Sequence, residues 1–319
     1  MRWGILSTGW IAEQFVTDLQ HLPDAEAVAV GSRTPAAAQA FADRFGIPHA
    51  HGSWPALVED PLVDAVYIAT PHQAHFEASM LSLTAGKATL TEKPVTLDAD
   101  HAEKLIETAR GNDVFFMEAM WMRCIPAIRR AAGMIADGAI GDVTTVQADF
   151  GLQGPFTEPH RLVTKALGGG ALLDLGIYPV TFAHLFLGVP QWIQAWAGLT
   201  EGGVDDNTGM VFGYESGALA MLACSLTGDT PRTATITGTL GRIEFGRGFF
   251  NPQGFTLWHG EDAEEVGQPF AGKGYHFEAA EVQRCVGEGL LESPLIPHVE
   301  TLAVMRTLDA VRSKIGVVY

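Results

Sequence analysis

The stretch WGILSTGWIA at residues 3–12 decides how the first part of the chain is expected to fold. Its apolar start predicts a short buried strand, and a tight turn then opens an amphipathic helix. The turn is similar to the Gly-x-Gly-x-x-Gly/Ala pattern of dinucleotide-binding domains, in which a glycine lets the backbone approach a pyrophosphate at the helix N-terminus. Gly9 and Ala12 fit this pattern, but Ser7 replaces its first glycine. Such a degenerate match is equally compatible with a plain strand, turn and helix.

Beyond this turn, strand-like and helical segments alternate up to about residue 120. Apolar strands are predicted at 27–31, 65–69, 88–91 and 114–117, and helices at about 73–85 and 98–110. This alternation predicts a parallel, doubly wound sheet, with a dinucleotide lying across the carboxyl ends of its strands. The turn residues expected at the cofactor are Ser7, Thr8, Gly9, Trp10 and Ile11.

The end of the second strand is where a dinucleotide-binding domain contacts the adenosine ribose. An NAD-preferring site places a carboxylate there to bind the 2′-hydroxyl. This chain instead has Ser32, Arg33 and Thr34, a guanidinium between two hydroxyls that suits a 2′-phosphate. We therefore expect NADP(H) as the preferred cofactor and NAD(H) as the other candidate. The alternative is that Arg33 is only a solvated loop residue.

Three polar residues follow the strand at 65–69, namely Thr70, His72 and His75. Two histidines three residues apart can ligate a metal, but no nearby cysteine or carboxylate completes a ligand set. We therefore expect no metal, and we place all three residues beside the cofactor, in a loop and at the start of a helix.

Glu92 and Lys93 end the strand at 88–91 and precede Pro94. A proline restricts the residue before it to an extended backbone, which holds Lys93 near the expected position of the nicotinamide. As a bare tripeptide, Glu-Lys-Pro is also an ordinary charged turn. We assign Glu92 and Lys93 to the cofactor site.

The expected domains are a dinucleotide-binding Rossmann domain at 1–120 and a substrate-binding α+β domain at 121–319. In the second domain, short strands joined by glycine turns predict a large, mostly antiparallel sheet. These strands are expected at 143–150, 191–199, 208–214, 218–226, 233–239, 242–245 and 255–259. Helices at about 275–288 and 298–314 would cover one face. The other face is then a natural homodimer surface.

The segment GGGALLDLGIYPV at residues 168–180 carries a carboxylate and a phenol within an apolar run. On an α-helix, Asp174 and Tyr178 would face the same side. Pro179 fits a first helical turn, so the helix is expected to begin near Ile177. The three glycines permit close backbone approach to a ligand or a second domain. The segment equally suits a plain buried helix with Asp174 as its N-cap and Tyr178 in the core.

The net charge of −17 argues against nucleic acid or an anionic membrane as a partner, because both attract a positive surface. The 3 cysteines are too scattered for a disulfide framework or a metal knuckle, and they suit a reducing compartment. We expect no signal peptide and no apolar run of membrane-spanning length. These features together predict a cytoplasmic protein.

Taken together, several blocks resemble the Gfo/Idh/MocA oxidoreductase family. They are the turn at 7–12, the tripeptide at 92–94, the tripeptide at 121–123 and the segment at 168–180. Shorter blocks at 117–121, 203–206 and 292–297 are similar to its dihydrodiol and D-xylose dehydrogenase subgroup. The resemblance covers essentially the whole chain. It implies an NADP(H)-dependent enzyme that oxidises a hydroxyl, or reduces a carbonyl, of a sugar, polyol or trans-dihydrodiol.

The resemblance also implies residue roles. Lys93 and Tyr178 would form the catalytic pair, with Asp174 beside them. In this hypothesis Tyr178 carries the proton, Lys93 stabilises its phenolate and Asp174 orients both, although Lys93 could instead carry the proton itself. Residues assigned to the substrate are Trp121, Phe150 and Tyr178, and Trp121 and Arg123 are also assigned to the cofactor. Two other functions stay open: another sugar, cyclitol or deoxysugar dehydrogenase, or a non-catalytic NADP(H)-binding sensor.

Overall fold

The computed structural model describes all residues, 1–319, and divides into two compact units. The first unit is Met1–Cys124 with Ala271–Thr301, and the second is Ile125–Phe270 with Leu302–Tyr319. Each unit has its own sheet. The first division lies close to the expected boundary after residue 120. The segment at 271–301, however, was expected in the second domain and belongs to the first unit.

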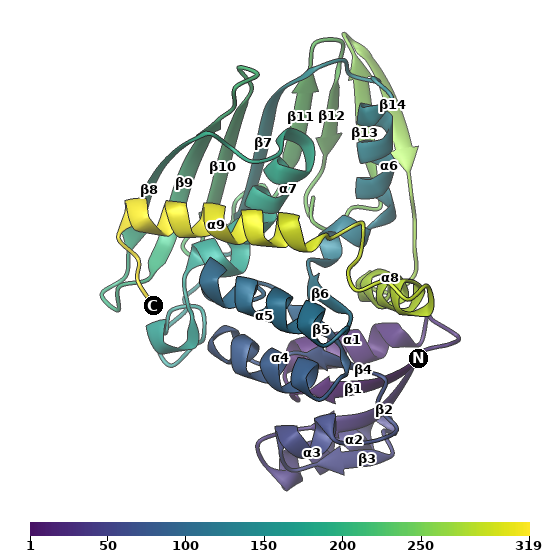
Figure 1. Cartoon of the computed structure of the whole chain (residues 1–319). Helices are drawn as coiled ribbons and strands as arrows, with labels where there is room; N and C mark the ends of the chain where they lie inside the picture. Colours follow the sequence, from purple (N-terminus) through teal and green to yellow (C-terminus); the bar gives the residue numbers. More distant parts are fainter. The chain divides into compact units, whose positions relative to one another are not determined.

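The first unit is built on a six-stranded parallel sheet with the order β3-β2-β1-β4-β5-β6 (Figure 1). Its strands are β1 (Arg2–Leu6), β2 (Glu26–Gly31), β3 (His49–His51), β4 (Ala65–Ile68), β5 (Ala88–Glu92) and β6 (Phe116–Ala119). Every neighbouring pair is parallel. The strand order reverses at β1, the place where open α/β sheets bind their ligands. The predicted doubly wound sheet is confirmed.

Helices accompany the strands of this unit. They are α1 (Trp10–Leu19), α2 (Pro35–Phe45), α3 (Trp54–Val58), α4 (His75–Thr84), α5 (Ala99–Gly111) and α8 (Tyr275–Gly287). Sequence analysis assigned no element to residues 35–58, where α2, β3 and α3 lie. Local signals for both helices are present, because Thr34 and Ser53 each accept a hydrogen bond at the helix N-terminus and a proline follows in the first turn.

Aromatic rings fix α1 on the sheet of the first unit. Phe15 of α1 stacks on Tyr67 of β4 with ring centroids 3.8 Å apart. The same ring meets Trp3 of β1 edge-on at 5.3 Å. All three side chains are fully buried. The turn that precedes α1 is therefore held over the centre of the sheet.

The second unit is built on an eight-stranded sheet with the order β14-β13-β12-β11-β7-β10-β9-β8 (Figure 1). Its strands are β7 (Val143–Gly151), β8 (Trp192–Leu199), β9 (Asp205–Gly213), β10 (Leu219–Ser225), β11 (Ala234–Gly238), β12 (Arg242–Phe245), β13 (Gly254–His259) and β14 (Asp262–Gly267). Only β7 and β10 pair in parallel; the other pairs are antiparallel. The predicted large, mostly antiparallel sheet is confirmed, and β14 lies beyond the strands that were expected.

The helices of the second unit are α6 (Pro126–Ala136), α7 (Ile177–Leu187) and the part of α9 (His298–Ile315) that follows residue 301. α7 packs against β7 and β10. His184 of α7 and Thr307 of α9 are joined by a hydrogen bond of 3.0 Å. Alternate residues of β8, β9 and β10 remain exposed, so one face of this part of the sheet is open and apolar.

The helical stretch Lys165–Leu187 corrects one expectation. We expected no apolar run of membrane-spanning length, but these 23 residues are long and apolar enough to cross a membrane. In the structure, 83% of the apolar window is buried inside the protein. The apolar character of this stretch is therefore explained by its place in the protein core.

Candidate active site

The turn between β1 and α1 has a glycine-like backbone at its first position. Ser7 has a backbone φ of 120°, in a region that favours glycine, and it stands where the pattern has its first glycine. Its N–H donates to the Gly31 carbonyl at 2.9 Å, which ties the turn to the end of β2. Gly9 is the N-cap residue of α1, and no side chain caps this helix. The first N–H groups of α1 can therefore bind a pyrophosphate.

The end of β2 presents the residues expected at the adenosine ribose. Arg33 and Thr34 are exposed, whereas Ser32 is buried. The Thr34 hydroxyl accepts a hydrogen bond from the Ala37 N–H at 3.3 Å and caps α2. Arg33 thus lies beside the N-terminus of α2, where the helix dipole also favours an anion. Both features suit a 2′-phosphate.

His75 is fully buried at the start of α4 and lies between two strand ends. Its Nδ1 is 2.7 Å from the Pro94 carbonyl oxygen, and its Nε2 is 2.8 Å from that of Thr70. Burial, followed by the charge of nearby His72, lowers the pKa of His75 to about 3. The neutral ring has one N–H and donates to only one of the two carbonyls. His75 therefore supports the loops after β4 and β5.

The backbone around Lys93 is fixed on both sides. Glu92, 5% exposed, accepts hydrogen bonds from the Tyr67 hydroxyl and from the Lys93 backbone N–H, the latter at 3.1 Å. On the other side, the Val95 N–H donates to Glu118 Oε1 at 3.0 Å. Carboxylates of β5 and β6 thus hold the turn that carries Lys93 at the carboxyl end of the sheet.

Trp121 and Arg123 lie in the short turn η2 (Trp121–Cys124) after β6, and both are buried. The Trp121 ring stacks on Tyr275 of α8 with centroids 4.5 Å apart. Arg123 forms an ion pair with Glu300. Both partners belong to the segment at 271–301, which explains why this segment is part of the first unit.

In the second unit, Asp174 and Tyr178 lie on adjoining but different helical segments. Asp174 belongs to a π-helical segment, η4 (Leu172–Gly176), and Tyr178 to the first turn of α7. α7 begins at Ile177, as Pro179 predicted. A π turn contains more residues than an α turn, so the same-side relation of an ideal α-helix does not apply unchanged to this pair.

Asp174 is held by an arginine that sequence analysis did not identify. Arg161 donates from Nη1 to Oδ1 at 3.0 Å and from Nη2 to Oδ2 at 3.3 Å. Asp174 is not the N-cap of α7, because that position is taken by Gly176 and has no side-chain cap. The alternative interpretation, in which Asp174 is the N-cap of the buried helix, is therefore wrong. Nothing in the polar loop around Arg161 distinguished it in the sequence.

Tyr178 belongs to an aromatic cluster with Phe150 and Phe250. Phe150 stacks on Phe250 with centroids 4.3 Å apart. The Tyr178 ring lies 5.4 Å from Phe150 and 5.3 Å from Phe250. Two residues assigned to the substrate, Phe150 and Tyr178, are thus brought together. Phe250 was missed, although adjacent phenylalanines in a glycine-rich loop were a visible signal.

The glycine triplet is required by the protein's own packing. Gly170 has a φ of 124°, and a Cβ atom there would lie 2.4 Å from Oδ1 of Asp205. The other oxygen of Asp205 accepts hydrogen bonds from the Leu172 N–H at 2.8 Å and the Thr208 hydroxyl at 2.7 Å. The triplet therefore lets the chain pass close to a buried carboxylate just before η4.

Comparison with known proteins decides the family. A model described as an oxidoreductase family with an NAD-binding Rossmann fold matches residues 1–120, and the GFO/IDH/MocA C-terminal domain matches residues 128–244. The chain belongs to the GFO/IDH/MocA oxidoreductase family. The resemblance expected from the sequence is confirmed, and so is the prediction that this protein is a dehydrogenase or reductase.

Relatives in the GFO/IDH/MocA family match over the full length. Bovine trans-1,2-dihydrobenzene-1,2-diol dehydrogenase is 37% identical over 100% of this chain and 98% of its own. A 3-ketoreductase from Actinomadura kijaniata, solved with NADP and TDP-benzene, is 29% identical with a TM-score of 0.87, covering 99% of this chain and 98% of that one. An aldose-aldose oxidoreductase from Caulobacter crescentus has a TM-score of 0.90 over 98% of this chain and 97% of its own, and at 22% identity it shows the fold alone.

The predicted site of this GFO/IDH/MocA protein falls into two groups. The first unit carries the residues assigned to the dinucleotide, which lie at or beyond the carboxyl ends of parallel strands, together with Lys93. The second unit carries Asp174, Tyr178 and Phe150. Lys93 and Tyr178 belong to different units, so their pairing stays a prediction. The individual roles of the cofactor and substrate residues also stay predictions.

Proposed function

We propose that this protein is an NADP(H)-dependent oxidoreductase that transfers hydride between the nicotinamide and a hydroxyl or carbonyl of a sugar or trans-dihydrodiol. The observation that carries the proposal is the 37% identity with bovine trans-1,2-dihydrobenzene-1,2-diol dehydrogenase over 100% of this chain. The similarity therefore includes both the dinucleotide-binding part and the part expected to bind the substrate.

The preference for NADP(H) is supported by the end of β2. Arg33 is exposed at the N-terminus of α2, and no carboxylate occupies positions 32–34 to repel a 2′-phosphate. The uncapped N-terminus of α1 suits the pyrophosphate. Among similar structures, the Actinomadura ketoreductase was solved with NADP. We expect Arg33→Ala to weaken NADP⁺ binding more than tenfold and to leave NAD⁺ binding nearly unchanged.

Side chains of the protein have to accept the proton that the substrate hydroxyl loses during oxidation. Bound NADP⁺ would accept the hydride when a hydroxyl is oxidised. Tyr178 would take the hydroxyl proton, and the Lys93 ammonium would stabilise the resulting phenolate. Asp174, already held by Arg161 at two points, would fix the orientation of this group. A direct proton-transfer role for Lys93 is the alternative assignment.

The substrate class is tested by NADP⁺ reduction, followed by NADPH absorbance, against D-xylose, other aldoses, cyclitols and a trans-dihydrodiol. Turnover of an aldose or the diol, with NADP⁺ preferred to NAD⁺, supports the proposal. Turnover confined to a cyclitol or deoxysugar favours another dehydrogenase of the same family. Tight NADPH binding without turnover of any substrate favours the non-catalytic sensor.

A homodimer formed through the open face of the second unit's sheet is also part of the proposal. Trp192 and Trp196 are 60% and 75% exposed on β8, and Val211, Leu219 and Met221 are at least 40% exposed on β9 and β10. Exposed apolar patches of this kind mark interaction surfaces. Light scattering should give a dimer for the wild type and a monomer for Trp196→Glu. A monomeric wild type would contradict the assignment.

We also propose a cytoplasmic location and no nucleic-acid or membrane partner. The net charge of −17 supports this, because it disfavours polyanions. The three cysteines are buried and none of them forms a disulfide, which suits a reducing compartment. Fractionation of cells that express the tagged full chain tests the location.

A further inference from the structure

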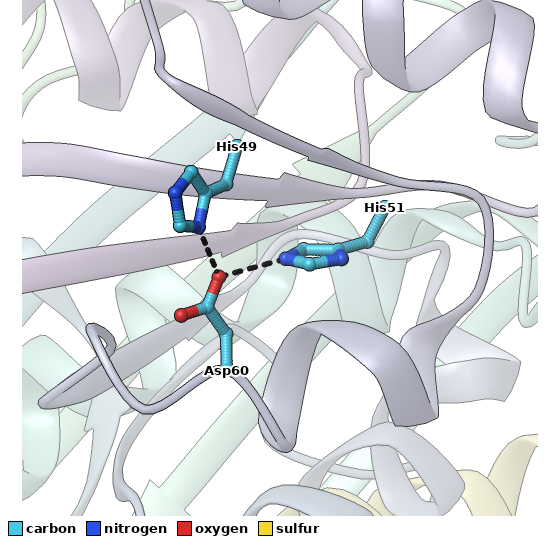
Figure 2. A group of neighbouring side chains, drawn as sticks. All are labelled: His49, His51 and Asp60. Carbon is cyan, nitrogen blue, oxygen red and sulfur yellow. Dashed lines mark hydrogen bonds and ion pairs between the residues drawn. The ribbon is translucent and has the colours of Figure 1, made fainter.

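Two histidines and one aspartate of the first unit converge, and none of the three has been assigned a role above. His49 and His51 lie on β3, and Asp60 follows α3 (Figure 2). Oδ2 of Asp60 is 2.6 Å from Nδ1 of His49 and 2.8 Å from Nε2 of His51. The three potential ligand atoms lie within 4.8 Å of one another.

Local structure brings these groups together. Residues two apart on a strand face the same side, so both imidazoles of β3 point to Asp60. The carboxylate itself is anchored, because its Oδ1 accepts the Leu62 N–H at 2.9 Å. Next to it, the Lys87 ammonium donates to the backbone carbonyl of Asp60 at 3.0 Å, which fixes the chain there.

The cluster is exposed to solvent through its imidazoles, whereas its carboxylate is buried. The Asp60 side chain is 2% exposed, whereas those of His49 and His51 are 41% and 23% exposed. An ion can therefore enter past the imidazoles, and the carboxylate needs little rearrangement to meet it. This combination of a rigid buried oxygen and two accessible ring nitrogens differs from a surface His–Asp pair.

We propose that His49, His51 and Asp60 form a binding site for a divalent transition-metal cation of the Zn²⁺ type. Two imidazoles and one carboxylate are ligands that such ions prefer, and water would complete a tetrahedron. Ligands about 2.0–2.1 Å from the ion lie ~3.3 Å apart, so the two separations between the Asp60 oxygen and the ring nitrogens need to widen by about 0.5–0.7 Å. Each imidazole then carries its hydrogen on the nitrogen that faces away from the ion.

The site is connected to the adenosine end of the dinucleotide-binding region. The Ser32 N–H donates to the His51 carbonyl at 3.0 Å, directly before Arg33. After β3, Gly52 packs so closely on Pro35 of α2 that a Cβ atom would lie 2.5 Å from its ring. An ion that fixes β3 would therefore also fix the turn at 32–34. This consequence rests on the proposed NADP(H) function.

Metal binding is tested on the full chain without nucleotide. After treatment with a chelator, the protein is titrated with Zn²⁺ alone by calorimetry. The wild type should bind one equivalent at this site, and His51→Gln and Asp60→Asn should bind it more than tenfold more weakly. His101→Gln is the matched control, because His101 pairs with Asp98 at 2.8 Å but has no third ligand nearby. It should bind like the wild type.

Either of two results of the Zn²⁺ titration would overturn the metal site. One is the absence of Zn²⁺ binding by the wild type, and the other is affinity in His51→Gln equal to that in His101→Gln. Circular dichroism confirms that each variant is folded. A measurement without any variant uses Co²⁺, whose visible absorption bands report a low-coordinate site with nitrogen and oxygen ligands. If the protein with Co²⁺ shows no more than the weak spectrum of hydrated Co²⁺, this result would also contradict the proposal.

The connection between the metal site and the cofactor is tested by a separate measurement of NADP⁺ affinity. Zn²⁺ should strengthen NADP⁺ binding to the wild type severalfold and have no such effect on His51→Gln. Equal NADP⁺ affinity with and without Zn²⁺ would overturn this connection. If NADP⁺ does not bind under either condition while Zn²⁺ does, the proposed function fails and the metal site stands.

Discussion

Arg161 holds Asp174 at two points, with its Nη1 and Nη2 atoms 3.0 Å and 3.3 Å from the two carboxylate oxygens. The Asp174 side chain is 6% exposed and that of Arg161 is 49% exposed. A carboxylate buried to this extent depends on its partner, because removing the arginine leaves the charge less well compensated. Arg161 also ties the polar loop to η4.

Replacing Arg161 should therefore destabilise the protein measurably. We expect Arg161→Ala to lower the free energy of unfolding by about 1–2 kcal/mol, less than for a fully buried pair because the guanidinium is half exposed. A double-mutant cycle with Asp174→Asn, measured by urea denaturation, should show a coupling of ~1 kcal/mol or more. Arg247→Ala is the control, since the Arg247–Asp229 pair is exposed on both sides. Equal losses in both variants would contradict this account.

Tyr178→Phe should remove the proposed proton-transfer group and leave the packing intact. The ring contacts with Phe150 and Phe250, at 5.4 Å and 5.3 Å, do not need the hydroxyl. We expect kcat to fall about 10²–10⁴-fold, with NADPH binding and the melting temperature nearly unchanged. Phe250→Leu is the control for the ring cluster, and it should raise KM more than it lowers kcat. Undiminished kcat in Tyr178→Phe would remove Tyr178 from the catalytic assignment.

Ser7→Gly should stabilise the protein. At a φ of 120°, a side chain is strained and glycine is not. We expect Ser7→Gly to exceed Ser7→Ala in free energy of unfolding by roughly 1 kcal/mol, since alanine keeps the strain and loses only the hydroxyl. Thermal and urea unfolding measure the difference. If alanine is as stable as glycine, the backbone at this position is not strained.

Glu118 should make stability depend on pH. Its burial raises the pKa of the carboxyl to about 7, despite hydrogen bonding from Val95 and the nearby charge of Arg123. The pKa of Glu118 is thus higher in the folded protein than the value of 4.5 expected in the unfolded chain. The contribution of Glu118 to stability is therefore fully present below about pH 4.5. As the pH rises toward 7 the unfolded chain loses this proton first, so the free energy of unfolding falls by up to ~3 kcal/mol.

Glu118→Gln should remove this dependence. Relative to the wild type, the variant should gain stability steadily between about pH 4.5 and pH 7 and stay level above that range. Urea denaturation across this pH range measures it. Glu107→Gln on the exposed side of α5 is the control and should follow the wild type. A constant difference between Glu118→Gln and the wild type would show that Glu118 titrates alike in both states.

Local patterns in the sequence were enough to predict the class of each sheet, although they missed β3 and β14. Apolar strands alternating with helical patterns sufficed for the parallel sheet, and short strands with glycine turns sufficed for the antiparallel one. The order and spacing of the short motifs sufficed to indicate the family. Pro179 even located the start of α7 at Ile177. These features are local, because backbone conformation and periodic burial are encoded by residues close together in the chain.

The contacts between residues far apart in the chain became known from the tertiary fold alone. Arg161 reaches Asp174 from a loop without periodicity, and Phe250 joins Tyr178 from a loop far along the chain. His49 and Asp60 converge because α3, which precedes Asp60, packs against β1, β2 and β3. Spacing along the chain carries no record of such contacts, since they depend on how strands order and helices pack. The sequence therefore indicated the family and the expected chemistry, while packing selected the partners of the key side chains.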